Sequence, residues 1–362
     1  MTSGNPGVAR PSLAPRARWL LPLLIVLLAA VTLHRYSRPP ERRFLELEGS
    51  AMGTTWSVKL AVSALPAEQE RAVEDAVTSR IERVDALMST WKPDSELSRF
   101  NRHASTEPFP ASAETLSVFR VAREVSELSD GAFDVTVAPL VSAWGFGPGE
   151  RAAAPPGDDV LTPLRRRVGF RRVEIEPAAG MLRKTAGDVE CDLSAVAKGF
   201  AVDEVARALA ALGQTRFLVE IGGELRAAGG HLDGAPWRVA IEAPDVSGRR
   251  IHRIVTLRDR AMATSGDYRN YYEIEGRRVS HTIDPRSGRP ITHSLASVTV
   301  VAADAARADA LATALHVLGP EAGYALAEAQ GIAAYFIVRT PEAGHESRMT
   351  WVFEPLLAGP PD

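Results

Sequence analysis

Asp309 and Thr313 are four positions apart in a stretch whose apolar pattern predicts a helix over residues 303–318. Residues at i and i+4 project from one face of a helix, so a carboxylate and a hydroxyl would lie together. Two hard oxygen donors suit Mg²⁺, which takes few protein ligands and completes its shell with water and phosphate. Such pairs are also common on solvated helix faces, and spacing alone favours that simpler interpretation.

Lys198 and Gly199 lie near the start of a second predicted helix, over about residues 197–212. The early amides and the positive end of a helix dipole favour anions, and a lysine beside a glycine suits a phosphate pocket. The segment lacks the spacing of a Walker A loop. An exposed helical lysine is the simpler alternative.

His281 stands in a polar segment, residues 280–288, that is richer in hydrogen-bonding groups than a plain connection needs. A histidine there could orient or deprotonate a hydroxyl nucleophile, although a lone histidine is more often structural. Gly222 and Gly223 precede Glu224 at the end of a predicted strand. Two glycines permit either a close ligand approach or an ordinary turn.

The elements that must position these residues are strands interspersed with helices without strict alternation, which predicts an α+β fold. Helices are expected over residues 66–88, 112–129, 197–212, 303–318 and 320–330, and strands over 44–48, 54–61, 173–176, 216–221, 237–243, 251–257, 268–274, 297–302 and 333–338. A loop rich in Gly, Pro and Ala over residues 145–159 is a candidate boundary between two lobes.

The composition excludes some classes of function. The chain has 362 residues, 45% of them hydrophobic, which is enough for a large core. A formal charge of −3 argues against nucleic acid as a partner. Cys191 is the single cysteine, so it can form neither an internal disulfide nor a cysteine-based zinc site, and a buried structural role is expected.

The N-terminal region predicts attachment to a membrane. Residues 1–18 are polar, residues 19–34 form an apolar anchor or signal segment, and residues 35–45 form a tether rich in Arg and Pro. An uncleaved anchor is favoured over a cleaved signal peptide because no small-residue cleavage site follows the apolar run. Residues 46–340 are then expected to form the globular domain, and residues 341–362 a final strand with a frayed tail.

Eight short motifs resemble, in their order, those of the ApbE family of FAD:protein FMN transferases. They cover about residues 50–320 and read MGTT, SELSRFN, GAFDVTVAPL with WGFG, DLSAVAKG, IGGE, SGDY, SHTIDP and DALATAL. The resemblance implies an ApbE-like, T-fold-like α+β architecture of mixed sheets with flanking helices, preceded here by the membrane-anchor helix.

The resemblance also implies a set of site residues. FAD would be contacted by Met52, Trp91, Ala132, Phe133, Asp134, Asp192, Lys198 and Ile283. Mg²⁺ would be held by the backbone carbonyl of Ala195 and the side chains of Asp309 and Thr313. Some family members carry an Asp immediately before the threonine, where this chain has Ala312. His281, with Lys198, would carry the chemistry near the phosphates.

The implied reaction transfers FMN from FAD to a Ser or Thr hydroxyl of an acceptor protein and releases AMP. Two alternatives remain open at this point: a Mg²⁺-dependent FAD pyrophosphatase, in which water replaces the hydroxyl, and a flavin-binding protein without chemistry. The acceptor would be a membrane-bound or exported redox protein. The expected location is the bacterial inner membrane, with the catalytic domain in the periplasm.

Overall fold

The computed structural model describes residues 27–29, 44–149, 152, 154–244, 248, 250–267, 271–274, 277–342 and 344–358, with the side chains of 271–274, 277 and 278 excepted. The chain divides into two compact units, Met1–Arg43 and Phe44–Asp362. The predicted anchor, residues 19–34, lies outside the described residues except for 27–29. Within the described part of the chain, no helix is both long and apolar enough to cross a bilayer.

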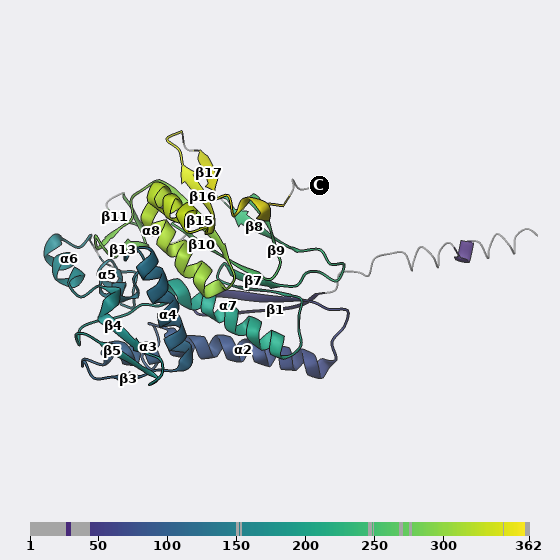
Figure 1. The fold of residues 1–362 in the computed structure, drawn as a ribbon, viewed down its shortest axis with the longest axis horizontal. Coiled ribbons are helices and arrows are strands. Elements are labelled where there is room, and N and C mark those ends of the chain that lie inside the picture. The colour runs from purple at the N-terminus through teal and green to yellow at the C-terminus, as the bar shows by residue number, and fades with distance from the viewer. Residues whose placement is uncertain are drawn as a thin grey trace, which may run out of the picture. The chain divides into compact units, whose positions relative to one another are not determined.

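An eight-stranded sheet forms the centre of the second unit, in the order β1-β2-β6-β7-β10-β15-β16-β17 (Figure 1). These strands are β1 (Phe44–Ala51), β2 (Thr54–Ala61), β6 (Phe217–Ile221), β7 (Glu224–Ala228), β10 (Arg260–Gly266), β15 (Leu295–Ala302), β16 (Ala333–Arg339) and β17 (His345–Met349). Every pairing between them is antiparallel. The prediction of an α+β fold with flanking helices is confirmed, but the expectation of mixed sheets is wrong, since every described strand pairing is antiparallel.

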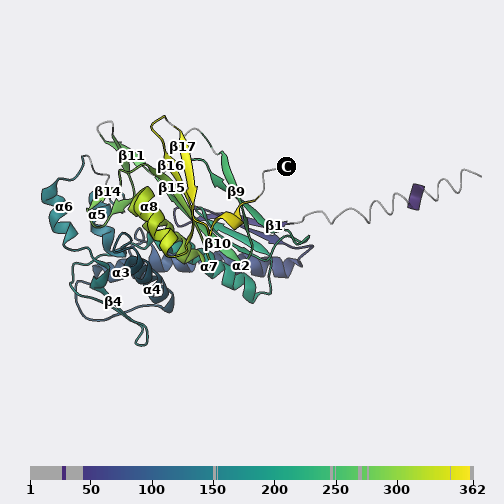
Figure 2. The same ribbon diagram turned by 45° about the horizontal axis from the view of Figure 1, so that its top comes forward.

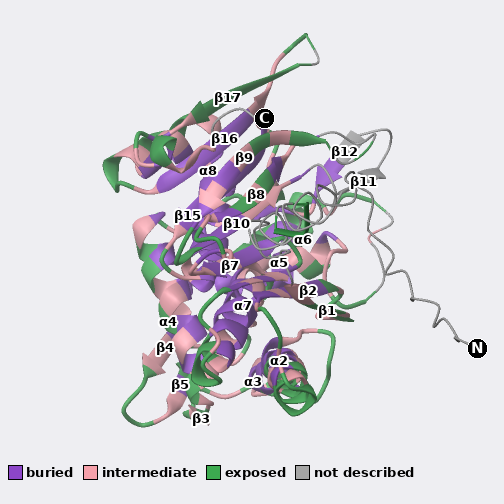
Figure 3. Cartoon of the chain, turned by 90° about the vertical axis from the view of Figure 1, so that its right-hand side faces the viewer, coloured by how far each residue is buried: buried purple, intermediate pink, exposed green. Residues whose placement is uncertain are grey.

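Two helices cover one face of this sheet. Helix α7 (Ser194–Ala211) packs on β6 and β7, and α8 (Ala305–Ala329) packs on β10 and β15. Alternate residues of β2, such as Trp56, Val58 and Leu60, point into the core beneath them. Figure 3 colours much of α7, α8 and β15 as buried. The layer formed by α7 and α8 positions the residues of the candidate site.

Two further helices pack outside that layer. Helix α2 (Ala67–Met88) lies alongside α7, and α4 (Ala113–Leu128) contacts α8 (Figures 1 and 2). The helix expected over residues 112–129 is α4, and its N-cap is Ser112, whose hydroxyl accepts a hydrogen bond from the Thr115 amide. The helix expected from residue 66 begins at Ala67, with Pro66 as its N-cap residue.

The opposite face of the sheet is covered by a hairpin of β8 (Trp237–Glu242) and β9 (Ile251–Leu257) and by the C-terminal segment. The predicted final strand is confirmed as β17, but the frayed tail is wrong. Phe353 is fully buried against Tyr335, and Leu357 bridges to Val255. These contacts extend the compact unit beyond residue 340 because one large aromatic side chain is enough to anchor a short segment.

The remaining described elements are not part of the central sheet. They are α3 (Glu96–Arg102), α5 (Ala138–Ala143), α6 (Asp158–Arg165), the 3₁₀ turns η1 (Val135–Val137), η2 (Phe170–Arg172) and η3 (Glu354–Leu356), the sheet β3 (Phe109–Pro110), β5 (Met181–Lys184) and β4 (Val173–Glu176), and the pairs β11 (Tyr271–Ile274) with β12 (Arg277–Ser280) and β13 (Ile283–Asp284) with β14 (Arg289–Pro290). Residues 145–159 contain a loop, but it does not separate two lobes, since residues 44–362 form one unit.

The two helices expected over residues 303–318 and 320–330 lie end to end in α8. The break between them is at Gly319, whose φ of 82° is non-helical, and Pro320 restarts the helix. Asp309 and Thr313 both lie in the first half of α8, as the spacing predicted.

Candidate active site

Lys198 and Glu224 form an ion pair between α7 and the start of β7. The Lys198 Nζ atom lies 2.6 Å from Glu224 Oε1, with side-chain exposures of 29% and 3%. Burial alone would lower the pKa of Lys198, but the Glu224 and Asp309 carboxylates outweigh it and hold that pKa above its ordinary value. A positively charged ammonium therefore lies at the first turns of α7.

The Gly222–Gly223 turn shapes the space beside this lysine. Gly222 has a φ of 63°, and a Cβ atom there would lie 2.9 Å from a Thr54 methyl and 3.1 Å from Lys198 Cδ. Its amide donates to the Thr55 carbonyl at 3.1 Å. The close approach of Thr54 and Lys198 to Gly222 explains why this residue is a glycine. The same approach brings the turn after Met52, a residue with a φ of 52°, next to Lys198.

Asp309 reaches across from α8 to the same turn of α7. Its Oδ2 atom accepts the Gly199 amide at 3.0 Å, and the residue is 5% exposed. In a helix the Gly199 amide would donate to the Ala195 carbonyl four residues earlier. The Gly199 N–H therefore lies next to both the Asp309 carboxylate and the Ala195 carbonyl. The predicted ligands Ala195 and Asp309 are neighbours for this reason.

Gly199 itself has a different role from the one its sequence suggested. A Cβ atom at this position would lie 2.3 Å from the Ala305 carbonyl oxygen, so glycine is needed for α7 and α8 to cross closely. Gly199 is therefore explained by helix packing, whereas the lysine–glycine pair was interpreted as part of a phosphate pocket.

Thr313 follows Asp309 by one helical turn and is partly exposed. Its hydroxyl makes no side-chain hydrogen bond to another described residue, and Asp309 Oδ1 is likewise without one. Burial raises the pKa of Asp309, although Lys198 and the Gly199 amide oppose that shift. A partly satisfied buried carboxylate, a hydroxyl and a main-chain carbonyl are a donor set that fits Mg²⁺. The described residues contain no cluster of three or more His, Cys, Asp or Glu side chains suited to a metal.

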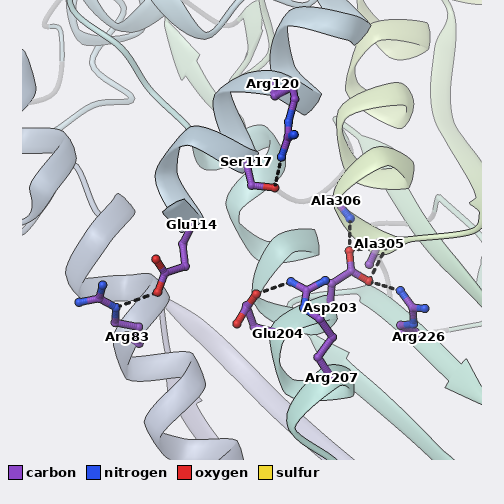
Figure 4. A network of polar contacts seen from close by, with 10 residues as sticks. All are labelled: Arg83, Glu114, Ser117, Arg120, Asp203, Glu204, Arg207, Arg226, Ala305 and Ala306. Carbon is purple, nitrogen blue, oxygen red and sulfur yellow. Dashed lines mark hydrogen bonds and ion pairs between the residues drawn. The ribbon is translucent and has the colours of Figure 1, made fainter. Parts of the chain in front are cut away.

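Asp203 fixes where α8 begins, as Figure 4 shows. Its carboxylate accepts the amides of Ala305 and Ala306 at 2.9 and 3.0 Å, and pairs with Arg226 at 2.6 Å. The first amides of a helix lack partners within it, and here a carboxylate from α7 supplies them. The contact places Asp309 one turn further along.

Asp134 and Asp192 are joined through the segment that precedes α7. The Asp192 amide donates to the Val135 carbonyl at 2.7 Å, while Asp134 caps η1 through the Thr136 amide at 2.8 Å. Burial raises the pKa of Asp134, although the Thr136 hydrogen bonds and Arg123 oppose it. Ala132 and Phe133 are buried beside it. The structure therefore brings together the predicted residues at 132–134 and 192.

Asn101 ties α3 to the same segment and was not singled out from the sequence. Its side-chain amide both donates to the Cys191 carbonyl and accepts the Cys191 amide, each at 2.8 Å. Cys191 is fully buried, and that burial raises the pKa of its thiol far above the ordinary value. The predicted structural role of this cysteine is confirmed.

His281 and Ile283 approach from the polar segment after β12. Ile283 is buried in a small cluster with Leu140 and Trp144, and the His281 ring lies 6.4 Å from that of Phe146. His281 also acts electrostatically on His316 of α8, one turn beyond Thr313. His316 is fully buried, and burial lowers its pKa to about 3.

Trp91 is the predicted site residue least tied to the others. Its amide donates to Ser89 Oγ at 3.2 Å, and its ring is 66% exposed. An exposed aromatic face could receive a planar ligand. Glu224 and Asp203 were missed as site-building residues, because only tertiary structure reveals that they face Lys198 and the start of α8.

The chain is similar in sequence to known enzymes over most of its length. An FAD:protein FMN transferase of Vibrio cholerae is 43% identical over 340 residues, covering 94% of this chain and 99% of the relative. The enzyme of the same name from Escherichia coli (strain K12) is 37% identical over 308 residues, covering 84% and 86%.

Solved structures agree with these sequence matches. The flavin transferase ApbE from Vibrio cholerae superposes with a TM-score of 0.78 at 41% identity, covering 87% of this chain and 99% of that one. The apo flavinyl transferase ApbE from Pseudomonas stutzeri gives a TM-score of 0.77 at 40% identity, covering 88% and 98%. The ApbE family profile matches residues 52–336. The chain therefore belongs to the ApbE family.

Proposed function

We propose that this protein is a FAD:protein FMN transferase, which moves FMN from FAD to a Ser or Thr hydroxyl of an acceptor protein and releases AMP. The relatives named for this reaction match nearly their whole length. The observation that carries the proposal is the convergence of Lys198, Asp309 and the Ala195 turn where α7 and α8 cross. These residues would provide a cation and oxygen ligands for a metal at one place. Both would neutralise the negative charge of a bound diphosphate.

The chain's own residues would serve the reaction in distinct ways. The acceptor oxygen attacks the phosphorus of the FMN half, its proton passes to a base, and the bond to the phosphate of AMP breaks. His281 is our candidate for that base, a role typically worth about 10² to 10⁴ in rate. Lys198 stabilises negative charge on the phosphates and on the departing AMP.

Ala195, Asp309 and Thr313 would hold Mg²⁺ beside the diphosphate, with Ala312 contributing no ligand. When bound, the metal supplies charge neutralisation and helps align the phosphates. The proposal is supported by three groups: a buried carboxylate and a hydroxyl, whose Oδ1 and Oγ1 atoms make no hydrogen bond to another described residue, and a carbonyl at a helix start. Transfer should stop in EDTA and return with added MgCl₂.

Met52, Trp91, Ala132, Phe133, Asp134, Asp192, Lys198 and Ile283 would contact FAD. The segments that carry Met52, Asp134 and Asp192 all adjoin the start of α7. The exposed Trp91 ring offers a surface for stacking. We also propose that residues 19–34 anchor the protein in the bacterial inner membrane, with the catalytic unit in the periplasm and an exported or membrane redox protein as acceptor.

The proposal is tested by incubating the purified full chain with FAD, MgCl₂ and a candidate acceptor. We expect flavin fluorescence on the acceptor band of a denaturing gel, with one AMP released per FMN attached. Free FMN plus AMP would instead indicate a pyrophosphatase, and unchanged FAD a binding protein. His281→Ala should lower the transfer rate by about 10² or more without changing FAD binding.

A further inference from the structure

Glu224 is the more buried partner of its ion pair with Lys198. The glutamate side chain is 3% exposed and the lysine side chain 29%, so the ammonium forms the open end. The main chain of Glu224 is held in the sheet, because Glu224 pairs with Ile221 across the two-residue Gly222–Gly223 turn. The more exposed Lys198 ammonium is therefore the partner that a ligand from solvent meets first.

The second carboxylate oxygen of Glu224 is unusual. Oε2 is buried and has no hydrogen-bond partner within the described part of the chain. An unpaired oxygen in such a place is costly, so the charge of Glu224 depends on its contact with Lys198. The same ammonium is the one assigned to the phosphates of FAD. A phosphate anion and Glu224 must then share a single cation.

We propose that Glu224 is a counter-charge that competes with phosphate for Lys198, weakening the binding of FAD and of the departing AMP so that AMP is released. This inference rests on the proposed function, since it takes FAD to bind at Lys198. Glu224 is a positioning residue in this scheme and touches neither the flavin nor the acceptor.

The charged groups around Glu224 come from three elements. Lys198 of α7 faces it directly, Asp309 of α8 acts on both, and Glu220 of β6 acts on Lys198. Burial raises the pKa of Glu224 to about 8, although Lys198 opposes this. Binding is therefore best measured at pH 9, where the carboxyl is ionised and the counter-charge is present.

The experiment compares FAD and AMP binding to the full-length wild type and Glu224→Gln by calorimetry at pH 9 with fixed MgCl₂. Glutamine keeps the shape and a hydrogen-bond acceptor but removes the charge. We expect both ligands to bind about 3- to 10-fold more tightly, the effect of one unit charge at a partly open site. Unchanged or weaker binding would overturn the proposal, because a residue that merely holds Lys198 in place predicts weaker binding.

Two further variants define the mechanism. In a Lys198→Met background the buried carboxyl loses its cation and becomes neutral, so adding Glu224→Gln should leave AMP affinity unchanged. Glu46→Gln, which breaks an exposed pair with Lys59 in the same sheet, is the matched control and should change nothing. A tightening of equal size in the Lys198→Met background would contradict action through Lys198.

The outcomes separate this inference from the proposed function. A wild type that binds neither FAD nor AMP refutes both, whereas a wild type that binds FAD, with no tightening in Glu224→Gln, refutes only the counter-charge. Should Glu224→Gln fail to fold, Glu224→Asp withdraws the carboxylate from Lys198 by one methylene group. It should tighten AMP binding in the same direction by a smaller factor, and weaker binding would again count against the proposal.

Discussion

At the scale of single residues, the candidate site combines three ionisable side chains, of which the two carboxylates are buried and the lysine is partly exposed. Lys198 faces Glu224 at 2.6 Å, and Asp309 accepts the Gly199 amide at 3.0 Å. Each carboxylate has one oxygen committed to a protein partner. Among the described residues, Asp309 Oδ1 and the Thr313 hydroxyl have no hydrogen-bond partner, which leaves them available to a metal, as the Lys198 ammonium is to an anion.

Thr313→Val should lower FMN transfer by about 100-fold or more, since it removes the oxygen proposed to bind the metal while preserving side-chain shape. Transfer is measured on an acceptor protein at saturating FAD, and thermal melting checks the fold. Thr313→Ser is the matched control because it retains the hydroxyl and should keep most activity. Full activity of the valine variant would show that Thr313 does not hold the metal.

At the scale of elements, the site depends on how α7 and α8 meet. Gly199 permits the crossing, and Asp203 caps the start of α8 (Figure 4). The helix periods predicted both helices and placed Asp309 and Thr313 on one face. The contacts between helices could not be predicted, because Asp203 and Ala305 are about a hundred residues apart and no local pattern links them.

Asp203→Ala should lower the free energy of unfolding by about 3 kcal/mol, because two helix amides and Arg226 lose a buried carboxylate. Urea unfolding measures the change. Glu204→Ala, on the same helix, removes only a pair with the largely exposed Arg207 and should cost less than about 1 kcal/mol. Equal losses in both variants would contradict the capping role.

At the scale of the whole molecule, one sheet carries a helical face with the site and a second face closed by the C-terminal segment. Alternating strands such as β2 were predicted from their period of two. Strands β7 and β10 were missed, since glycines, charges and small residues obscure their pattern, and the packing of residues 350–357 was missed because one phenylalanine gives no periodic signal. The order of family motifs carried more information about the site than any single pattern.

The C-terminal segment should contribute strongly to stability. Phe353→Ala is expected to cost about 3 to 5 kcal/mol, the usual effect of emptying a fully buried aromatic position. Trp351→Ala, two residues away and 68% exposed, should have little effect. Chemical denaturation of the two variants makes the comparison, and similar stabilities would mean that the segment does not pack in solution.

Stability should fall in acid partly because of His316. Its pKa is about 3 in the folded state against 6.5 when exposed, so only the unfolded state binds a proton between these values. The folded state therefore loses up to about 1.4 kcal/mol per pH unit as the pH falls from 6.5 toward 3. His316→Gln should reduce the slope of unfolding free energy against pH by about one proton, and an unchanged slope would contradict the buried neutral state.

The most direct test of the account is a crystal structure of the protein with FAD and Mg²⁺. We expect one cation at about 2.0 to 2.1 Å from the Ala195 carbonyl, Asp309 and Thr313, with the Lys198 ammonium on a phosphate oxygen. A cation bound elsewhere, or a diphosphate remote from the crossing of α7 and α8, would contradict it.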